Sequence, residues 1–291
     1  MDAFSPTSHS YISSRLKLHY VDWGNAGAPL VVLVHGGLDH CRSWDWTARR
    51  LQPDWHVVAI DLRGHGDSAW SSDGRYSVDS FVADLAQFLH QKRETAARIV
   101  AHSLGGHVAS RYAAIYPEKV EKLVLVEGLG WSEKLQREQD ATPLRERLRA
   151  SYEKRRLLSG RSLRRYSSLE SAIDRMREEN PNLSLEQATH LTRYGVSQNE
   201  DGSYSWKFDN YARLMSPCDL DGPQIQALWR AITCPTLLMY GLDSWATSPR
   251  IDGRIDYFNY AHLIEYERAG HWPHHDRFET FITDVRAFLA D

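Results

Sequence analysis

The chain has 291 residues, of which 42% are hydrophobic, and its formal net charge is −3. That length is long for one compact domain and short for two, so it suits one core carrying an insertion. The net charge is slightly negative, whereas nucleic-acid-binding domains are usually basic. We therefore expect no nucleic-acid partner.

The cysteines and the N-terminal segment bear on the compartment. Cys41, Cys218 and Cys234 have no spacing typical of a disulfide framework, which fits a reducing environment. A secretory signal has an apolar segment after a basic start, and residues 1–20 contain none. No apolar run approaches the roughly 20 residues of a membrane helix. We therefore expect a cytoplasmic protein with no membrane partner; the oligomeric state stays open.

Strands alternate with helices over the first 130 residues. Residues 16–23 alternate in polarity and predict a half-buried strand. Continuous apolar runs, typical of strands covered on both faces, lie at 30–34, 56–60, 99–102 and 122–126. Helices are predicted at 44–51, at 77–92 and between residue 103 and Pro117.

The pattern changes at residue 131. Charged helical segments replace the buried strands, at 144–158, 169–179 and 185–194. Their arginines are mixed with acidic residues, which indicates a solvated face. Strand and helix patterns return at 236–240, 262–267 and 278–289. We predict an α/β fold, a mostly parallel sheet with helices on both faces, with its core at 1–130 and 222–291 and a helical cap inserted at 131–221.

Chemistry in such sheets lies beyond the carboxyl ends of the strands. Ser103 stands there in Ala101-His102-Ser103-Leu104-Gly105, the pattern of a nucleophile elbow with alanine in place of the first glycine. The small neighbours matter because the serine backbone is strained at this sharp turn. Asp243 follows the predicted strand at 236–240 and His271 the one at 262–267, which gives the order Ser, Asp, His.

Four motifs, each after a predicted strand, occur in order: His35-Gly36-Gly37, Asp61-x-Arg63-Gly64-His65-Gly66-x-Ser68, the Ser103 elbow and Gly270-His271. Together they make nearly the whole chain resemble the capped serine hydrolases of the α/β-hydrolase superfamily. The resemblance implies that Ser103 is the nucleophile and His271 its base. It also implies an oxyanion hole made by the backbone N–H groups of Gly37 and Leu104. No cofactor or metal is expected.

The acid that supports His271 has two candidates. The family usually places aspartate in Gly-x-x-Asp, whereas Gly241-Leu242-Asp243 is one residue shorter and Ser244 stands at the usual position. Haloalkane dehalogenases of the superfamily use an acid after the preceding sheet strand instead, where this chain has Glu127. We favour Asp243, and Glu127 is the alternative.

Other residues near the strand ends receive structural interpretations. We expect His35 to brace the oxyanion loop, and His102 and His107 to be packing or surface residues. Asp61 and Arg63 are interpreted as a structural turn with an ion pair. Of five tryptophans near the strand ends or in the cap, we expect one or two to line an apolar acyl pocket: Trp44, Trp131, Trp206, Trp245 and Trp272.

Ser103 argues against epoxide hydrolases and haloalkane dehalogenases, which carry aspartate there. We expect a small, mainly apolar ester as the substrate; a carbon–carbon bond hydrolase, a lactonase and a perhydrolase are alternatives on the same residues. A metal hydrolase is disfavoured, because the histidines at 271–276 lack the usual ligand spacing; His274 and His275 more simply open the last helix. A receptor that does not catalyse is the alternative of another class.

Overall fold

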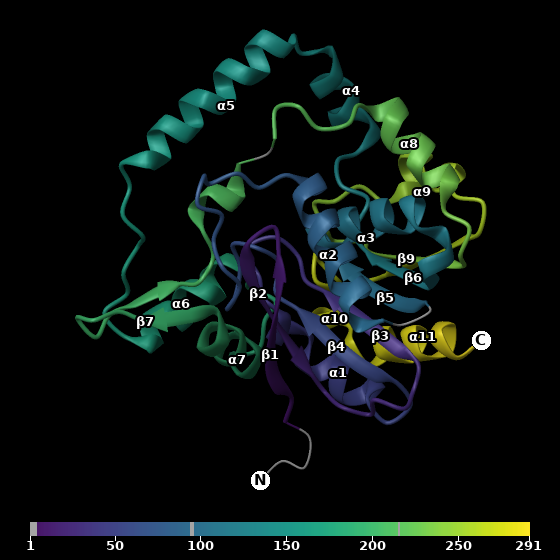
Figure 1. Cartoon of the computed structure of the whole chain (residues 1–291), viewed down its shortest axis with the longest axis horizontal. Coiled ribbons are helices and arrows are strands. Elements are labelled where there is room, and N and C mark those ends of the chain that lie inside the picture. The colour runs from purple at the N-terminus through teal and green to yellow at the C-terminus, as the bar shows by residue number, and fades with distance from the viewer. Residues whose placement is uncertain (1–4, 94–95, 215) are drawn as a thin grey trace.

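The computed structural model describes residues 5–93, 96–214 and 216–291. Its centre is an eight-stranded sheet in the order β1-β2-β4-β3-β5-β6-β9-β10 (Figure 1). The strands are β1 (Thr7–Ser13), β2 (Leu16–Asp22), β3 (Leu30–Val34), β4 (His56–Ile60), β5 (Ala97–His102), β6 (Val120–Val126), β9 (Thr236–Gly241) and β10 (Ala261–Tyr266). From β4 to β10 all neighbours are parallel, and β1 and β2 are antiparallel to theirs. The expected α/β fold is confirmed.

Both faces of the sheet are covered, which explains the uninterrupted apolar runs. Val32 and Val34 point to one face and Val31 and Leu33 to the other, because side chains alternate along a strand. The first face packs against α2 (Val78–Lys92), α3 (Leu104–Ile115) and α8 (Gly222–Ala231). The second packs against α1 (Asp45–Leu51) and α11 (Phe278–Ala290), with α10 (Pro273–Asp276) beside them.

The register of the central strands brings the site together. His102 at the end of β5 pairs with Val126 of β6, which pairs with Met239 of β9. Gly241 of β9 in turn pairs with Tyr266 of β10. The loops that follow these four strands therefore start side by side at one edge of the sheet.

Most of the segment between β6 and α8 is helical, as the charged periodic pattern predicts. It contains α4 (Glu133–Ala141), α5 (Leu144–Ser159), α6 (Leu169–Glu179) and α7 (Leu185–Gly195). Buried strands are absent from this described segment, as expected, but it contains a short hairpin that was not predicted, β7 (Val196–Gln198) with β8 (Tyr204–Trp206), whose residues are mostly not buried. Helix α5 arches away from the core (Figure 1) and buries no residue. The assignment of 131–221 as a cap remains a prediction.

The remaining short helices are η1 (Cys41–Trp44), η2 (Pro117–Lys119), η3 (Asn210–Arg213), α9 (Pro249–Asp252) and η4 (Arg254–Tyr257). The sequence analysis did not predict β1 or α4. Strand β1 has five exposed residues out of seven, and α4 has no buried residue, so neither carries a strong apolar periodicity.

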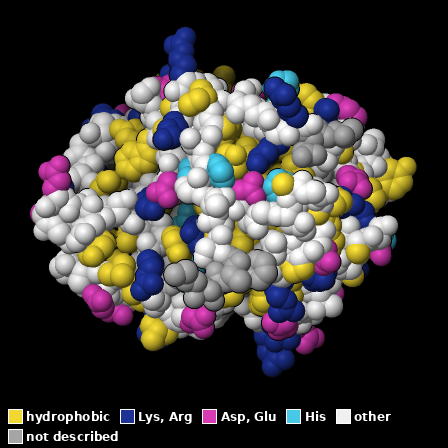
Figure 2. Space-filling view, turned by 60° about the horizontal axis from the view of Figure 1, so that its bottom comes forward, with side chains coloured by type: hydrophobic (Ala, Val, Ile, Leu, Met, Phe, Trp, Pro, Cys, Tyr) yellow, Lys and Arg dark blue, Asp and Glu magenta, His cyan; other side chains and the backbone are white. Residues whose placement is uncertain are grey.

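Acidic and basic side chains are interspersed over the face of the molecule in Figure 2, with no single basic patch. This agrees with the mixed charges of the helices in the sequence. Among the helices of the described residues, none combines the length and the apolar character that crossing a membrane requires.

Candidate active site

Ser103 stands at a sharp strand-to-helix turn. Its backbone has φ 49° and ψ −116°, a conformation that L-residues rarely adopt. Gly105 lies so close to β3 that an added Cβ would come within 2.5 Å of the carbonyl oxygen of His35. Ala101 is fully buried and its methyl group is accommodated in the core. The turn thus holds the serine side chain above the sheet edge.

The imidazole of His271 faces this serine from the loop after β10. The Ser103 hydroxyl lies 3.0 Å from Nε2 of His271. Nδ1 of the same ring lies 2.5 Å from Oε2 of Glu127. We assign the proton to Nδ1, because the carboxylate can only accept, so that Nε2 is free to accept from the serine hydroxyl.

The expectation that Asp243 lies behind His271 is wrong: Glu127 occupies that position. The Glu127 side chain is buried, and its Oε1 accepts from the backbone N–H of Gly241 at 2.8 Å. Asp243 lies in the same loop but is exposed, and its backbone N–H donates to the carbonyl of Ala269 at 2.9 Å. The loop after β9 therefore turns the Asp243 carboxylate toward solvent.

Sequence reasoning missed the part that Ser244 takes in this arrangement. Its hydroxyl donates to Oε2 of Glu127 at 2.6 Å, and its oxygen accepts from the N–H of Ala246 at 3.1 Å. A serine at the usual position of the family aspartate was the signal available in the sequence. It fits a carboxylate supplied by a neighbouring strand and held there by a hydroxyl.

Two backbone N–H groups are candidates to stabilise an oxyanion. Leu104 is the first residue of α3, and the first N–H groups of a helix have no partner within it. Gly37 follows β3, and a Cβ built on it would lie 3.9 Å from the Leu104 side chain. Both residues line one cavity with Ser103. This position is compatible with the predicted oxyanion hole, which remains a proposal.

The loop that carries Gly37 is braced from behind by His35, as expected. Nδ1 of His35 donates to the carbonyl of Gly36 at 2.6 Å, and Nε2 accepts from the N–H of Leu62 at 3.0 Å. Burial lowers the pKa of this histidine to about 3. The neutral ring can therefore accept from Leu62 and donate to Gly36 at the same time.

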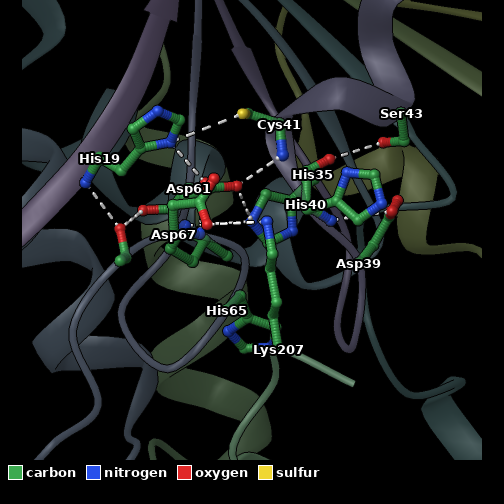
Figure 3. A network of polar contacts seen from close by, with 12 residues as sticks. His19, His35, Asp39, His40, Cys41, Ser43, Asp61, His65, Asp67 and Lys207 are labelled. Carbon is green, nitrogen blue, oxygen red and sulfur yellow. Dashed lines mark hydrogen bonds and ion pairs between the residues drawn. The ribbon is translucent and has the colours of Figure 1, made fainter. Parts of the chain in front are cut away.

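Asp61, in the loop after β4, makes polar contacts that hold this loop beside the loop that carries His35 (Figure 3). Its carboxylate accepts from the N–H groups of Cys41 at 2.7 Å and Asp67 at 2.9 Å, and lies 2.6 Å from Nδ1 of His19. The expected pairing of Asp61 with Arg63 is wrong. Arg63 instead binds Asp84 of α2 with two contacts of 2.6 Å.

Ligand-type atoms of His19, Cys41 and Asp61 lie within 4.8 Å of one another. Burial raises the pKa of the Cys41 thiol, which disfavours the thiolate that binds metals. Hydrogen bonds already occupy both oxygens of Asp61. We therefore assign this cluster to bracing the loop.

A cavity of about 680 Å³ opens above Ser103, within the usual size range of ligand sites. Three of the five tryptophans considered from the sequence line it, namely Trp206, Trp245 and Trp272. Further apolar walls come from α2, through Val78 and Phe81, and from the segment between β6 and α8. The remaining two tryptophans lie elsewhere.

A family model described as the alpha/beta hydrolase family matches residues 31–284 of the chain. The chain belongs to this family. It is 28% identical over 282 residues to the esterase Rv0045c of Mycobacterium tuberculosis, covering 92% of this chain and 84% of that protein. It is also 34% identical to epoxide hydrolase 4 of Mus musculus over 123 residues, which are 41% of this chain and 34% of that relative. The chain thus matches about one third of the length of that relative.

Among solved structures, the fold is similar to that of a thioesterase domain from the curacin biosynthetic pathway. The TM-score is 0.83 at 23% identity, and the match covers 97% of this chain and 99% of that domain. A likeness at this identity shows the fold alone. The family match and the curated relatives make the chain a hydrolase of the alpha/beta type.

Several histidines lie buried behind the site. The ring of His102 lies 4.8 Å from the ring of His271, and the ring of His274 lies 4.7 Å from that of His102. Nε2 of His102 donates to the carbonyl of His271 at 2.8 Å, so it supports the loop directly. The expectation that His274 and His275 open the last helix is wrong, since they belong to the separate short helix α10, which precedes α11.

We expect acid to destabilise the protein because of such buried histidines. Burial lowers the pKa of six of them: His35, His65, His102, His107, His274 and His275. For three of them the folded-state pKa is known in size: it is about 3 for His35 and His275 and about 4 for His107. Below the unfolded pKa of about 6.5, the unfolded state binds more protons than the folded state. The free energy of unfolding should then fall by about 1.4 kcal/mol per pH unit for each such group.

Urea unfolding at pH 7.5 and at pH 5 measures this loss. Buried Asp39 and half-buried Asp276, whose pKa desolvation raises, act in the opposite direction but are fewer. His275→Gln should reduce the loss between the two pH values, whereas His262→Gln, at an exposed position, should not. Equal stability of the unmodified protein at both pH values would contradict the expectation.

Proposed function

We propose that the protein is a serine hydrolase that cleaves a small, mainly apolar ester or related acyl substrate through an acyl-enzyme. In this proposal Ser103 is the nucleophile, His271 the general base and Glu127 the acid that orients it. The observation that carries the proposal is the continuous set of contacts from Ser103 to His271 at 3.0 Å and from His271 to Glu127 at 2.5 Å.

In the first half-reaction the Ser103 oxygen bonds to the acyl carbon while Nε2 of His271 takes the hydroxyl proton. The bond from the acyl carbon to the alcohol oxygen then breaks, and the leaving alcohol receives that proton. In the second half-reaction, water attacks the acyl-enzyme with the same assistance and releases the carboxylic acid and free serine. The N–H groups of Gly37 and Leu104 would stabilise the oxyanion of each tetrahedral intermediate. One such donor typically lowers the activation free energy by about 3 to 4 kcal/mol.

Glu127 has a defined part in this scheme. Ionised, it holds the proton of His271 on Nδ1 and stabilises the imidazolium that forms when Nε2 is protonated. Its two further hydrogen bonds, from Gly241 and Ser244, hold the carboxylate in position against His271. The serine at position 103 does not support the mechanism of the epoxide hydrolases, which carry aspartate there.

A panel of p-nitrophenyl esters with acyl chains of increasing length tests the proposal, together with a fluorophosphonate probe that labels active serines. We expect turnover of the short esters and labelling of one serine, at position 103, identified by peptide mass spectrometry. Hydrolysis that proceeds without labelling of Ser103 would contradict the mechanism. The absence of both turnover and labelling would favour a receptor that does not catalyse.

Carbon–carbon bond cleavage, lactone hydrolysis and perhydrolysis use the same residues on other substrates. A lactone series and a β-diketone series in the same assay separate the first two from ester hydrolysis. Ester hydrolysis is preferred because the curated relative matched over most of both chains is an esterase.

A further inference from the structure

We propose that the substrate of this site has an anionic end, a carboxylate or another oxyacid group, which an apolar chain separates from the scissile bond and which Arg213 binds, while Arg164 adds positive charge at the other end of the cavity wall. The inference rests on the proposed function, because it concerns the same cavity. Both arginines line the cavity that opens above Ser103.

The charges that line this cavity do not cancel. Five charged residues line it: Arg164, Arg175, Arg213, Glu179 and Asp219. Arg175 forms an ion pair with Glu179. Arg175 also pairs with Glu178, which does not line the cavity. Asp219 is held by both terminal nitrogens of Arg111, at 2.7 and 2.9 Å. Within the described ranges, Arg164 and Arg213 have no acidic partner, so these two lining side chains carry unpaired positive charges.

The two arginines flank an aromatic wall of the cavity, formed by Tyr166, Trp206 and Phe208. The Phe208 and Trp206 rings are stacked, with centroids 6.2 Å apart and an angle of 9° between their planes. The indole N–H of Trp206 donates to the Tyr166 hydroxyl at 3.1 Å. Side chains from two separate parts of the segment, residue 166 and residues 206–208, are therefore fixed as one apolar surface.

Each arginine rests on one end of this wall. The guanidinium carbon of Arg213 lies 5.1 Å from the centre of the Phe208 ring, and that of Arg164 lies 5.0 Å from the centre of the Tyr166 ring. Stacking on an aromatic ring orients a guanidinium but does not neutralise it, and its N–H groups stay free to donate. A planar guanidinium matches the two oxygens of a carboxylate or phosphate.

This arrangement refines the expectation of a mainly apolar substrate. Tyr166, Trp206 and Phe208 would contact the apolar chain, and Arg213 would contact its anionic end. Arg164 would add positive charge at the other end of the wall. The anion can belong to the acyl group or to the leaving alcohol, since both arrangements place an apolar chain between the charge and the scissile bond.

Matched pairs of substrates test the inference, each pair differing only in the charge of the distal end. In the acyl arm, monomethyl esters of dicarboxylic acids of increasing length are compared with the methyl esters of the corresponding monoamides. In the alcohol arm, acetate esters of ω-hydroxy acids are compared with those of the ω-hydroxy amides. Proton release measures kcat/KM for every member, and the acid-to-amide ratio is the readout.

We expect the ratio to exceed about ten for at least one chain length in one arm, and that arm identifies where the anion lies. Arg213→Gln should lower the ratio about tenfold, and Arg164→Gln should lower it by the same factor or less. In both variants kcat/KM for the amide substrates should change little. Arg213→Glu should favour the amide. The matched control is Arg165→Gln, because Arg165 is exposed like Arg164 and Arg213 but pairs with Asp201 and does not line the cavity.

An acid-to-amide ratio near one at every length in both arms would overturn the inference while the amide turnover upholds the proposed function. The same loss of preference in Arg165→Gln as in Arg213→Gln would also overturn it, because the effect would then come from overall charge. If no ester is hydrolysed and Ser103 is not labelled by a fluorophosphonate, the proposed function fails instead.

Discussion

Ser103→Ala should reduce ester hydrolysis by about 10⁴-fold or more while the protein stays folded. The reason is that no other hydroxyl is hydrogen-bonded to Nε2 of His271 in the described residues. Alanine removes only the oxygen, and the strained backbone of residue 103, with φ 49°, still carries a Cβ as before. The kcat for a p-nitrophenyl ester and the melting temperature measure the two parts of the expectation.

Ser110→Ala is the matched control for this variant. Ser110 is buried in α3, the helix that Ser103 precedes, and its hydroxyl donates to the carbonyl of His107 at 3.1 Å. We expect Ser110→Ala to keep its activity and its fluorophosphonate labelling. Turnover by Ser103→Ala at a rate close to that of the unmodified protein would refute the acyl-enzyme mechanism.

Glu127→Gln should lower kcat by about 10³- to 10⁴-fold. An amide of the same shape cannot satisfy both of its neighbours. If its oxygen accepts from Nδ1 of His271, its NH₂ group faces the N–H of Gly241, which also donates. If the amide is reversed, the NH₂ group faces Nδ1, and the imidazole is driven to the tautomer that cannot accept the serine proton.

Asp243→Asn is the comparison that separates the two candidate acids. Because the Asp243 side chain is exposed and lies outside the set of contacts to His271, we expect kcat to change by only a few fold at most. Melting temperatures of both variants show whether a loss in Glu127→Gln reflects unfolding. A loss of several orders of magnitude in Asp243→Asn, with Glu127→Gln nearly unaffected, would reverse the assignment.

The strands and the nucleophile turn were predictable from the sequence because their signals are local. Leu30–Val34 and His56–Ile60 are continuous apolar runs, and each forms a strand covered on both faces. The turn at Ser103 depends on small residues within two positions of it, and a five-residue window contains them all. His271 was found in the same way, directly after a predicted strand.

The acid could not be chosen by the same means. Glu127 and Asp243 both follow strands that end at the same edge of the sheet, so sequence position alone does not separate them. The choice depends on the direction in which each loop turns, which is fixed by contacts between segments more than 100 residues apart. The donation from Ser244 to Glu127 and that from Gly241 to Glu127 are two such contacts.

The sequence by itself therefore determined the α/β architecture, the serine and the histidine, because apolar periodicity and turn chemistry act over a few neighbouring residues. Only the tertiary structure decided that Glu127, and not Asp243, contacts His271, and that Arg164 and Arg213 meet one aromatic wall. Those juxtapositions depend on strand order and on the packing of distant segments, and short-range patterns in a chain carry no information about which distant side chains will meet.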